Sequence, residues 1–329
     1  MLLPRFDYLN PATIEDAGRL LKEHEPNARL VAGGTELFPR MKQRLTSPET
    51  LISLKEVKVQ EPSVSRDRSL ILSALMSLTS LTRSSAVLEK APLLAEAAKH
   101  VASNEIRNMG TLGGNLCQES RCLYYNQHHG FQFMENCFKR GGSFCYFIPK
   151  GKKCVAVYMS DSAPALMCLD AKIKIVGTGI ERELPIGDLF TGDAKNPFNI
   201  TSREILAEVT IPLTDMKEGW AFQKLTLRGG LEFGGLNVAV VLRMKDGART
   251  CKQARIAVGA VSAAPARATG AESRLEGKSL TTTLLDEAAQ AVADEIRITP
   301  HHGYSHAFLK EALRTHTRRA LYAALERAG

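Results

Sequence analysis

The stretch from Asn108 to Cys154 constrains the fold of this 329-residue chain more than any other. It opens with a glycine-dense segment, residues 108–117 (NMGTLGGNLC), in which hydrogen-bonding side chains flank the glycines. Five of the seven cysteines of the chain lie within these 47 residues. Because a glycine turn has no Cβ atoms, it can lie against a phosphate or a ring, and here it is joined directly to a group of thiols. We therefore expect a redox protein with two centres close together.

Four cysteines follow the glycine segment: Cys122, Cys137, Cys145 and Cys154, separated by 14, 7 and 8 residues. These gaps are wider than the close C-x₂₋₄-C pairs that are typical of structural zinc sites. Wide spacing suits a cubane cluster, whose four irons each need one cysteine. The residues alone leave three alternatives open: an iron–sulfur cluster, which the spacing favours, a zinc site, and unligated thiols.

The other cysteines and the nearby histidines carry weaker signals. We interpret Cys117, Cys168 and Cys251 as buried or incidental thiols. His128 and His129 are further candidate ligands, but a histidine pair in a solvent-facing loop is the simpler interpretation.

Composition places the chain among ordinary globular proteins, with 44% hydrophobic and 24% charged residues. Its length predicts two or three domains. It has no apolar run of about 18 residues that could span a membrane, and residues 1–7 do not read as a signal peptide, so we expect a cytoplasmic protein without disulfides. The net charge of +8 is spread along the chain without a nucleic-acid-binding motif, which disfavours DNA or RNA as a partner.

The hydrophobic pattern predicts an alternation of helices and strands up to about residue 215, where we place a domain boundary. Thr13 is expected to cap the first helix. Further helices are expected over 76–104, 283–297 and 304–327, and strands over 28–32, 51–54, 69–74, 169–176, 204–212, 220–228, 235–244 and 254–260. The part beyond residue 215 is expected to form an α+β domain with no chemistry of its own.

A second double glycine, Gly33-Gly34, follows the expected strand 28–32 and precedes Thr35. Strand, glycines and hydroxyl make a possible anion nest, although such a pair is often an ordinary tight turn. The segment is neither G-x-G-x-x-G nor a phosphate loop with lysine, which disfavours a nicotinamide dinucleotide fold. The two distant double glycines could clamp opposite sides of one elongated ligand.

Three segments occur in this order along the chain: residues 31–37 (VAGGTEL), 106–116 (IRNMGTLGGNL) and 160–166 (SDSAPAL). They resemble the FAD-contacting segments of the medium, flavin-binding subunits of the molybdenum hydroxylase (xanthine oxidase) family. The resemblance covers nearly the whole chain. The roughly 40 residues that carry the four cysteines form an insertion between the second and third segments, and this insertion resembles the one in the beta subunits of 4-hydroxybenzoyl-CoA reductases, which holds an additional [4Fe–4S] cluster.

The resemblance implies an α+β chain of two domains. Residues 1–215 would form an FAD-binding domain of the vanillyl-alcohol-oxidase (PCMH) type, with two lobes at about 1–56 and 57–215 and an iron–sulfur insertion at 117–156. Residues 216–329 would form a C-terminal domain of the CO dehydrogenase flavoprotein type.

The resemblance also implies the binding residues, position by position. The pyrophosphate of FAD would be held by Leu30, Val31, Ala32, Gly33, Gly34, Thr35, Glu36 and Leu37. The other side of the flavin would be lined by Val101, Ala102, Thr111, Gly114, Asn115, Cys117 and Gln118. Asp161 would bind near the ribityl chain or ring, Ile205 and Leu206 the adenine end, and Lys224 the ring edge, while Cys122, Cys137, Cys145 and Cys154 would ligate the cluster. Glu36 stands in a slot where Asp also occurs in the family, so its role is open.

No catalytic acid, base or nucleophile is expected, because the cofactors carry the chemistry. The resemblance implies electron transfer from a ferredoxin-like donor through [4Fe–4S] and FAD to a small [2Fe–2S] subunit and a large molybdopterin subunit. The reaction there would be the reductive dehydroxylation of 4-hydroxybenzoyl-CoA to benzoyl-CoA. The alternatives are the FAD subunit of another molybdenum hydroxylase, oxidising a xanthine-like or aromatic substrate with outward electron flow, and a zinc-stabilised scaffold subunit.

Basic residues are concentrated in the insertion: Lys139, Arg140, Lys150, Lys152 and Lys153. They would offset the negative charge of a four-thiolate cluster, and they are also a candidate docking patch for an acidic, ferredoxin-like protein.

Overall fold

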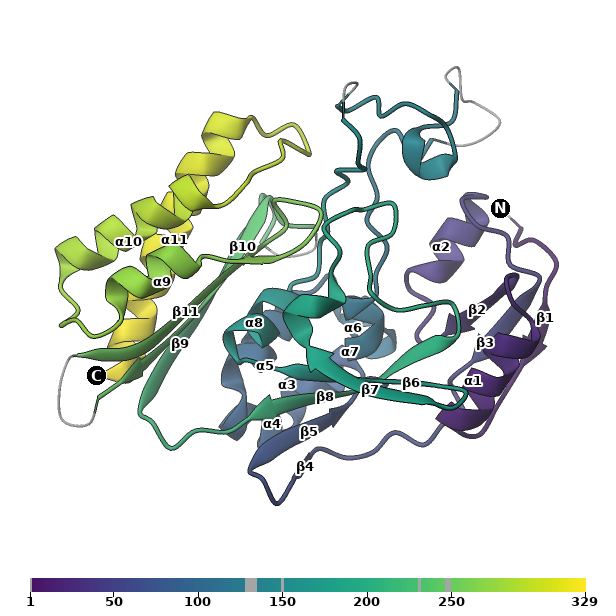
Figure 1. The fold of residues 1–329 in the computed structure, drawn as a ribbon, viewed down its shortest axis with the longest axis horizontal. Coiled ribbons are helices and arrows are strands. Elements are labelled where there is room, and N and C mark those ends of the chain that lie inside the picture. The colour runs from purple at the N-terminus through teal and green to yellow at the C-terminus, as the bar shows by residue number, and fades with distance from the viewer. Residues whose placement is uncertain (1, 128–134, 149–150, 230–231, 246–249) are drawn as a thin grey trace.

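The protein is described here as a computed structural model of residues 2–127, 135–148, 151–229, 232–245 and 250–329. The described residues form three β-sheets with helices packed against them, which confirms the expected α+β class. The N-terminal sheet, the central sheet and the C-terminal sheet follow one another across the molecule, and a teal segment projects from the top (Figure 1). Across the described residues, no helix combines the length and apolar character needed to cross a bilayer.

The N-terminal lobe is a small parallel sheet with the strand order β1-β3-β2. Its elements are β1 (Asp7–Leu9), α1 (Ile14–Glu23), β2 (Ala28–Val31), α2 (Leu37–Lys42) and β3 (Thr50–Ser53). The predicted cap of α1 is confirmed, since the Thr13 side chain accepts a hydrogen bond from the Asp16 amide at 3.1 Å. Helix α1 buries Ala17 and Leu21 against Ile52, which closes this lobe around its own apolar core.

The central sheet is antiparallel, with the strand order β4-β5-β8-β6-β7. Its strands are β4 (Ser63–Val64), β5 (Ser69–Ser73), β6 (Lys172–Gly177), β7 (Ile180–Pro185) and β8 (Glu204–Pro212), and the short 3₁₀ helix η3 (Ile186–Leu189) follows β7. The predicted strands at 69–74, 169–176 and 204–212 are therefore confirmed, whereas β4 and β7 were not predicted. Both run mostly exposed along the sheet edges, where little apolar periodicity is required.

Residues 76–104 were predicted to be helical throughout, and this prediction is wrong because the helix is interrupted. Three short helices occupy the range: α3 (Leu78–Arg83), α4 (Ser85–Lys90) and α5 (Pro92–Lys99). Ser84 ends α3 in an extended conformation and caps α4 by accepting from the Val87 amide at 3.4 Å. Pro92 occupies the first turn of α5, where its missing N–H costs nothing.

The glycine segment is not the turn that the sequence predicted. After α6 (Asn104–Met109), residues 112–116 form the short helix α7 (Leu112–Leu116). Thr111 caps it by accepting a hydrogen bond from the Gly114 amide at 3.0 Å. A Cβ on Gly113 would lie 2.9 Å from the Cβ of Ala74, so this glycine lets α7 pack directly on the chain after β5.

The C-terminal part is an antiparallel sheet covered by helices on one face (Figure 1). It comprises β9 (Glu218–Leu225), β10 (Leu236–Met244), β11 (Cys251–Gly259), β12 (Ala266–Arg267), α9 (Thr269–Leu275), α10 (Thr282–Glu295) and α11 (His306–Ala328). The three long strands and the two long helices confirm the sequence predictions. Helix α8 (Ser162–Cys168) packs against β10 and β11 and so joins this sheet to the central part of the molecule.

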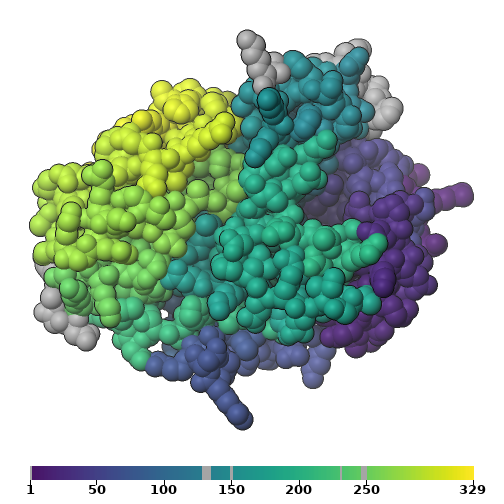
Figure 2. Space-filling model, viewed as in Figure 1, coloured from purple at the N-terminus to yellow at the C-terminus, as the bar shows by residue number. Residues whose placement is uncertain are grey.

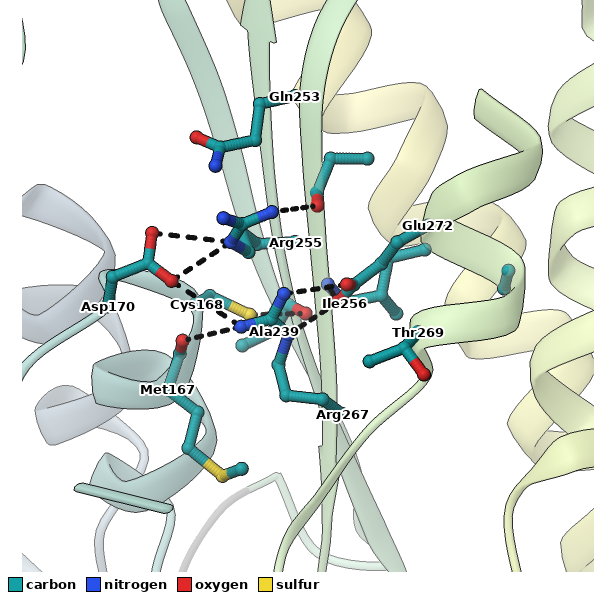
Figure 3. A network of polar contacts seen from close by, with 12 residues as sticks. Met167, Cys168, Asp170, Ala239, Gln253, Arg255, Ile256, Arg267, Thr269 and Glu272 are labelled. Carbon is teal, nitrogen blue, oxygen red and sulfur yellow. Dashed lines mark hydrogen bonds and ion pairs between the residues drawn. The ribbon is translucent and has the colours of Figure 1, made fainter. Parts of the chain in front are cut away.

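One carboxylate anchors that junction (Figure 3). Asp170 directly follows α8 and accepts hydrogen bonds from Arg243 at 3.0 Å and from Arg255 at 2.9 Å. Arg267 approaches the same side chain at 3.5 Å and also pairs with Glu272. Three guanidinium groups of the C-terminal sheet thus converge on one acidic residue of the N-terminal half, which fixes the position of the two halves relative to each other.

The cysteine-containing insertion, residues 117–156, is built differently from the rest of the chain. Its described residues contain one 3₁₀ turn, η2 (Phe138–Arg140), and an isolated bridge between Cys137 and Phe144. Figure 2 shows this teal segment at the top of the molecule, beside the yellow part of the C-terminal region. The arrangement of the insertion therefore depends on side-chain contacts more than on a hydrogen-bonded ladder.

Candidate functional site

The first candidate site is a cavity of about 180 Å³ between the N-terminal lobe and α7, here called the glycine cavity. It brings together thirteen of the residues expected to bind FAD, namely Leu30, Val31, Ala32, Gly33, Gly34, Thr35, Glu36, Leu37, Thr111, Gly114, Cys117, Ile205 and Leu206. Leu54, Ala74, Leu75 and Gly113 complete the lining and were not predicted. The two double glycines do lie on one cavity, as the clamp hypothesis requires.

Backbone contact between the two glycine segments explains why glycine is required there. A Cβ on Gly33 would lie 1.8 Å from the carbonyl oxygen of Met109, a distance at which the two chains could not both keep their places. Gly34 has a φ of +68°, in the left-handed region that favours glycine. One part of the wall of the glycine cavity is therefore made of main chain, set by close approach of segments about 75 residues apart.

This wall has the chemistry of an anion cradle. Within the described part of the chain, the amides of Gly34, Thr35 and Glu36 donate to no acceptor, and neighbouring free amides form nests for phosphate oxygens. A Cβ on Gly114 would meet only the Thr111 hydroxyl, at 3.0 Å, because the Cα of this exposed residue borders the cavity. The donor set and the glycine walls fit the pyrophosphate of a dinucleotide such as FAD.

Asp161 and Lys224, which were expected at the flavin, lie outside the lining of the glycine cavity and form a buried pair. The Lys224 Nζ donates to Asp161 Oδ2 at 2.7 Å and to the His100 carbonyl oxygen at 2.8 Å. Asn237 donates to the other Asp161 oxygen at 2.8 Å. Burial raises the pKa of Asp161, although Lys224 and Asn237 oppose the shift. The pair ties β9 and β10 to the start of α8.

The four remaining residues expected at the flavin are held in place by polar contacts nearby. Asn115 accepts a hydrogen bond from the Ser160 hydroxyl at 2.6 Å, and Gln118 donates to the Asn115 carbonyl at 2.9 Å. Arg107 donates to the carbonyl oxygens of Val101 and Ala102 at 2.6 and 2.7 Å. Ala102 has a φ of +42°, which is rare for a residue with a Cβ. Their contact with a cofactor stays a prediction.

The second candidate site is a larger cavity of about 700 Å³, here called the cysteine cavity. All four predicted metal ligands, Cys122, Cys137, Cys145 and Cys154, line it. Burial raises the pKa of the Cys122 thiol, and the neighbouring Cys137 and Cys145 raise it further. Burial likewise raises the pKa of Cys154 to about 11, with Lys139 opposing the shift. Cysteines spread over 33 positions of the sequence are thus gathered around one space.

The thiols are not arranged around a single ion. Among the described residues, no three His, Cys, Asp or Glu side chains come close enough to hold one metal ion. Tetrahedral structural zinc takes four Cys or His ligands, with sulfurs at about 2.3 Å. Four thiols around one cavity are also the donor set of a cubane cluster, in which each cysteine binds a different iron.

A segment of the C-terminal domain forms the opposite wall of the cysteine cavity, and the sequence did not predict this. Residues 299–305, between α10 and α11, line it together with the cysteines. His301 Nδ1 lies 2.8 Å from the Thr299 carbonyl oxygen, and its buried Nε2 has no hydrogen-bond partner among the described residues. The C-terminal domain, for which the sequence predicted no chemistry of its own, therefore contributes to the wall of this cavity. The predicted candidates His128 and His129 lie outside the described residues.

Lys139 also departs from the prediction. Its side chain is 4% exposed and its Nζ donates to Glu119 and to the Ser120 and Ala194 carbonyl oxygens, the latter two at 2.6 and 2.5 Å. It therefore cannot belong to an exposed docking patch. Lys152 and Lys153 are exposed, and Lys150 lies outside the described residues.

The interpretation of the other thiols is confirmed for two of three. Cys168 and Cys251 are fully buried, and burial raises the pKa of the Cys251 thiol to about 11. Cys117 is exposed at the border of the glycine cavity, so of the two alternatives, a buried or an incidental thiol, the first does not hold for it. Cys117 is the C-cap residue of α7, and the position of this helix places it at the cavity.

Comparison with known proteins gives a consistent result over both halves of the chain. Residues 4–214 match the family model described as the FAD binding domain in molybdopterin dehydrogenase, and residues 220–324 match the CO dehydrogenase flavoprotein C-terminal domain. The carbon monoxide dehydrogenase medium chain of Hydrogenophaga pseudoflava is 30% identical over 89% of this chain and 86% of its own length. The nicotine 6-hydroxylase medium subunit of Paenarthrobacter nicotinovorans is 29% identical over 95% and 96%.

Solved structures agree with these relatives. A chain of the carbon monoxide dehydrogenase from Hydrogenophaga pseudoflava superimposes with a TM-score of 0.80 at 26% identity, covering 99% of both chains. A chain of the reconstituted CO dehydrogenase from Oligotropha carboxidovorans gives a TM-score of 0.81 at 25% identity, covering 99% of this chain and 100% of that one.

Proposed function

Because this chain belongs to the family of FAD-binding domains found in molybdopterin dehydrogenases, we propose that it is the FAD-binding, electron-transfer subunit of a molybdenum hydroxylase complex. The observation that carries the proposal is the glycine cavity, where two main-chain segments and a row of free amides meet. We assign the FAD-binding domain to residues 1–215, with lobes at about 1–56 and 57–215, and the C-terminal domain to residues 216–329.

In this proposal the chain binds and orients, and FAD supplies the exchange between two-electron and one-electron transfer. The amides of residues 33–37 hold the pyrophosphate, and Gly114 leaves room for the cofactor against α7. Ile205 and Leu206 give an apolar surface for the adenine end. Asp161 and Lys224 hold β9 and α8 together beside the flavin end, so that the isoalloxazine ring would meet a preformed wall.

We further propose that Cys122, Cys137, Cys145 and Cys154 ligate a [4Fe–4S] cluster. The support is that these thiols share one cavity with room for a multinuclear group, without the close grouping that a single ion needs. The buried cation Lys139 lies on the same cavity and offsets part of the negative charge of such a cluster. A zinc-stabilised scaffold is the alternative that this geometry favours less.

We propose the partners and the direction of electron flow from the names of the relatives and from the cysteine cavity. Carbon monoxide dehydrogenase and nicotine 6-hydroxylase are named for oxidations, which favours electrons entering FAD from a molybdopterin subunit through a small [2Fe–2S] subunit and leaving to an external acceptor. The cysteine cavity favours a second candidate. An added cluster on this subunit suits inward flow from a ferredoxin-like donor, as in a 4-hydroxybenzoyl-CoA reductase that forms benzoyl-CoA.

Anaerobic purification of the chain with its partner subunits tests both directions. If electrons flow outward from the molybdenum centre through FAD, an oxidisable aromatic or N-heterocyclic substrate bleaches the flavin absorbance. Reduced ferredoxin then bleaches the flavin only slowly. If flow is inward, reduced ferredoxin bleaches the flavin, and 4-hydroxybenzoyl-CoA then restores its colour. Isolation of a complex with no molybdenum would overturn the proposed function.

A further inference from the structure

A continuous chain of partly buried charged and polar side chains links the two cavities. It consists of Glu36, Arg40, Glu119, Tyr125 and Lys139, and is called the charged bridge below. Glu36 lines the glycine cavity and Lys139 lines the cysteine cavity, so the bridge begins at one candidate cofactor site and ends at the other.

At the glycine-cavity end, Glu36 stands immediately before α2 and Arg40 lies one turn further along. Their side chains pair at 3.5 Å between Arg40 Nη1 and Glu36 Oε2. The other carboxylate oxygen of Glu36 is buried without a hydrogen-bond partner in the described structure. This part of the bridge is therefore attached to the same short segment that forms the amide cradle.

In the middle, Arg40 reaches into the insertion. Its Nη2 lies 3.4 Å from Glu119 Oε2 and donates to the Tyr125 hydroxyl at 3.4 Å. The Arg40 side chain is only 16% exposed and Tyr125 only 5%. One guanidinium thus contacts two residues of the insertion that lie about 80 positions away in the sequence.

At the cysteine-cavity end, Lys139 completes the chain. It pairs with Glu119 and lies 5.2 Å from the centre of the Tyr125 ring. Its two carbonyl acceptors, on Ser120 and Ala194, bind η2 both to the start of the insertion and to the loop after η3. A lysine so enclosed is held at one position beside the cysteines.

Burying such a set of charges carries a desolvation cost that apolar side chains of similar volume would avoid. The charged bridge therefore indicates a role other than stability. The described part of the insertion has little regular structure, so its position depends on side-chain contacts such as these. Distance and orientation between two redox centres govern electron transfer between them. An insertion that moved relative to the N-terminal lobe would vary that distance.

We propose that Arg40 is a positioning residue, which through Glu36 and Glu119 fixes the cysteine cavity relative to the glycine cavity so that electrons pass between their cofactors over one defined distance. This inference rests on the proposed function for the identity of the two cofactors. The attachment of the insertion to α2 can be measured independently of them.

The test compares Arg40→Met with Lys42→Met in the full chain purified anaerobically. Lys42 is an exposed cation on the same helix, so its variant controls for loss of a positive charge. Glu119→Gln, with the exposed Glu135→Gln as its control, removes one bridge charge at nearly constant shape and serves if Arg40→Met folds poorly. Arg40→Lys keeps the charge without the two-pronged geometry and is expected to restore the native behaviour only in part.

Two readouts separate positioning from general instability. Amide hydrogen exchange in residues 117–127 and 135–148 is expected to rise about tenfold or more in Arg40→Met, while β10 stays protected. In half-reduced protein, the distance distribution between the flavin radical and the reduced cluster, measured by pulsed electron spin resonance, is expected to broaden. Neither Lys42→Met nor Glu135→Gln changes either readout.

The outcomes are distinct. Unchanged exchange and an unchanged distance distribution in both bridge variants would overturn the positioning role and leave the proposed function standing. Unaltered protein without iron or without flavin would contradict the proposed function, while the exchange experiment would still decide whether the bridge holds the insertion.

Discussion

The glycine cavity and the cysteine cavity, the two proposed cofactor sites, are built in opposite ways. Part of the wall of the first is main chain, at a point where Gly33 meets the Met109 carbonyl and no side chain fits between them. The second is walled by side chains carried on irregular segments, with a further wall, residues 299–305, supplied by the other domain. A wall of main chain tolerates almost no substitution. A wall of side chains can be altered one group at a time.

The difference also separates two kinds of rigidity. The glycine cavity is set by main-chain contact between two segments about 75 residues apart, each held by the hydrogen bonds of its own strands and short helices. The cysteine cavity is set by side-chain contacts such as those of Lys139 and Arg40. We therefore expect damage at the glycine cavity to spread into the fold, and damage at the cysteine cavity to stay confined.

The largest effect is expected from Gly33→Ala. The new Cβ would overlap the Met109 carbonyl oxygen at 1.8 Å, so one of the two glycine segments must move. Flavin content should fall to near zero and the melting temperature should drop. Gly187→Ala is the matched control, because a Cβ there meets nothing nearer than the end of the Met167 side chain at 3.8 Å. Full flavin occupancy in Gly33→Ala would break the comparison.

Lys224→Met is expected to destabilise the chain by about 3–5 kcal/mol at neutral pH, the usual cost of leaving one member of a buried pair alone. Burial already raises the pKa of Asp161, and loss of Lys224 raises that pKa further. A protonated Asp161 needs no counter-charge, so the loss should shrink as the pH falls. Denaturant unfolding at several pH values measures this, and a loss independent of pH would contradict the role assigned to the pair.

Cys137→Ser is expected to remove iron and leave flavin and most of the stability unchanged. The buried Cys137 lines the cysteine cavity but has no part in the glycine cavity. Metal analysis and flavin absorbance of the anaerobic variant provide the measurement. Cys251→Ser is the control, since that buried thiol lies away from both cavities. Loss of flavin together with iron would show that the two cavities are not independent.

The smallest effect is expected at Glu204, which precedes the two residues that β8 places in the glycine cavity. Its hydrogen bonds with Arg182, at 2.8 and 3.1 Å, hold the pKa of Glu204 below its ordinary 4.5. Because the pKa of Glu204 is lower in the folded than in the unfolded protein, its ionised carboxylate stabilises the fold at any pH above the unfolded-state pKa. This stabilisation is lost as the pH falls through the pKa of the folded protein. Glu204→Gln should cost about 1 kcal/mol or less at pH 7 and flatten the acid limb of the stability curve. An unchanged acid limb would contradict this assignment.

Much of the fold could be predicted, because its signals are local. Thr13 capping α1 and the apolar pattern of β8, β10 and α11 depend on neighbours a few residues away. The prediction failed where a local signal was ambiguous. The glycines at 113–114 indicated a turn, but the Thr111 cap and the contact with Ala74 place them in a short helix.

The two sites also differed in how far their signals were local in the sequence. Residues 30–37 are contiguous, so a motif could indicate the amide cradle. The grouping of the four cysteines was suggested by their clustering in sequence, but the contribution of residues 299–305 depends on how α11 docks. The partnership of Arg40 with Glu119 likewise has no local signal, because it exists only once the insertion folds back over α2.

The most direct test of two separate cofactor sites on one chain is the simultaneous measurement of iron, acid-labile sulfide, zinc and flavin in one anaerobic preparation. We expect one [4Fe–4S] cluster and one FAD per chain, with zinc at trace level. Stoichiometric zinc without iron, or iron without flavin, would contradict it.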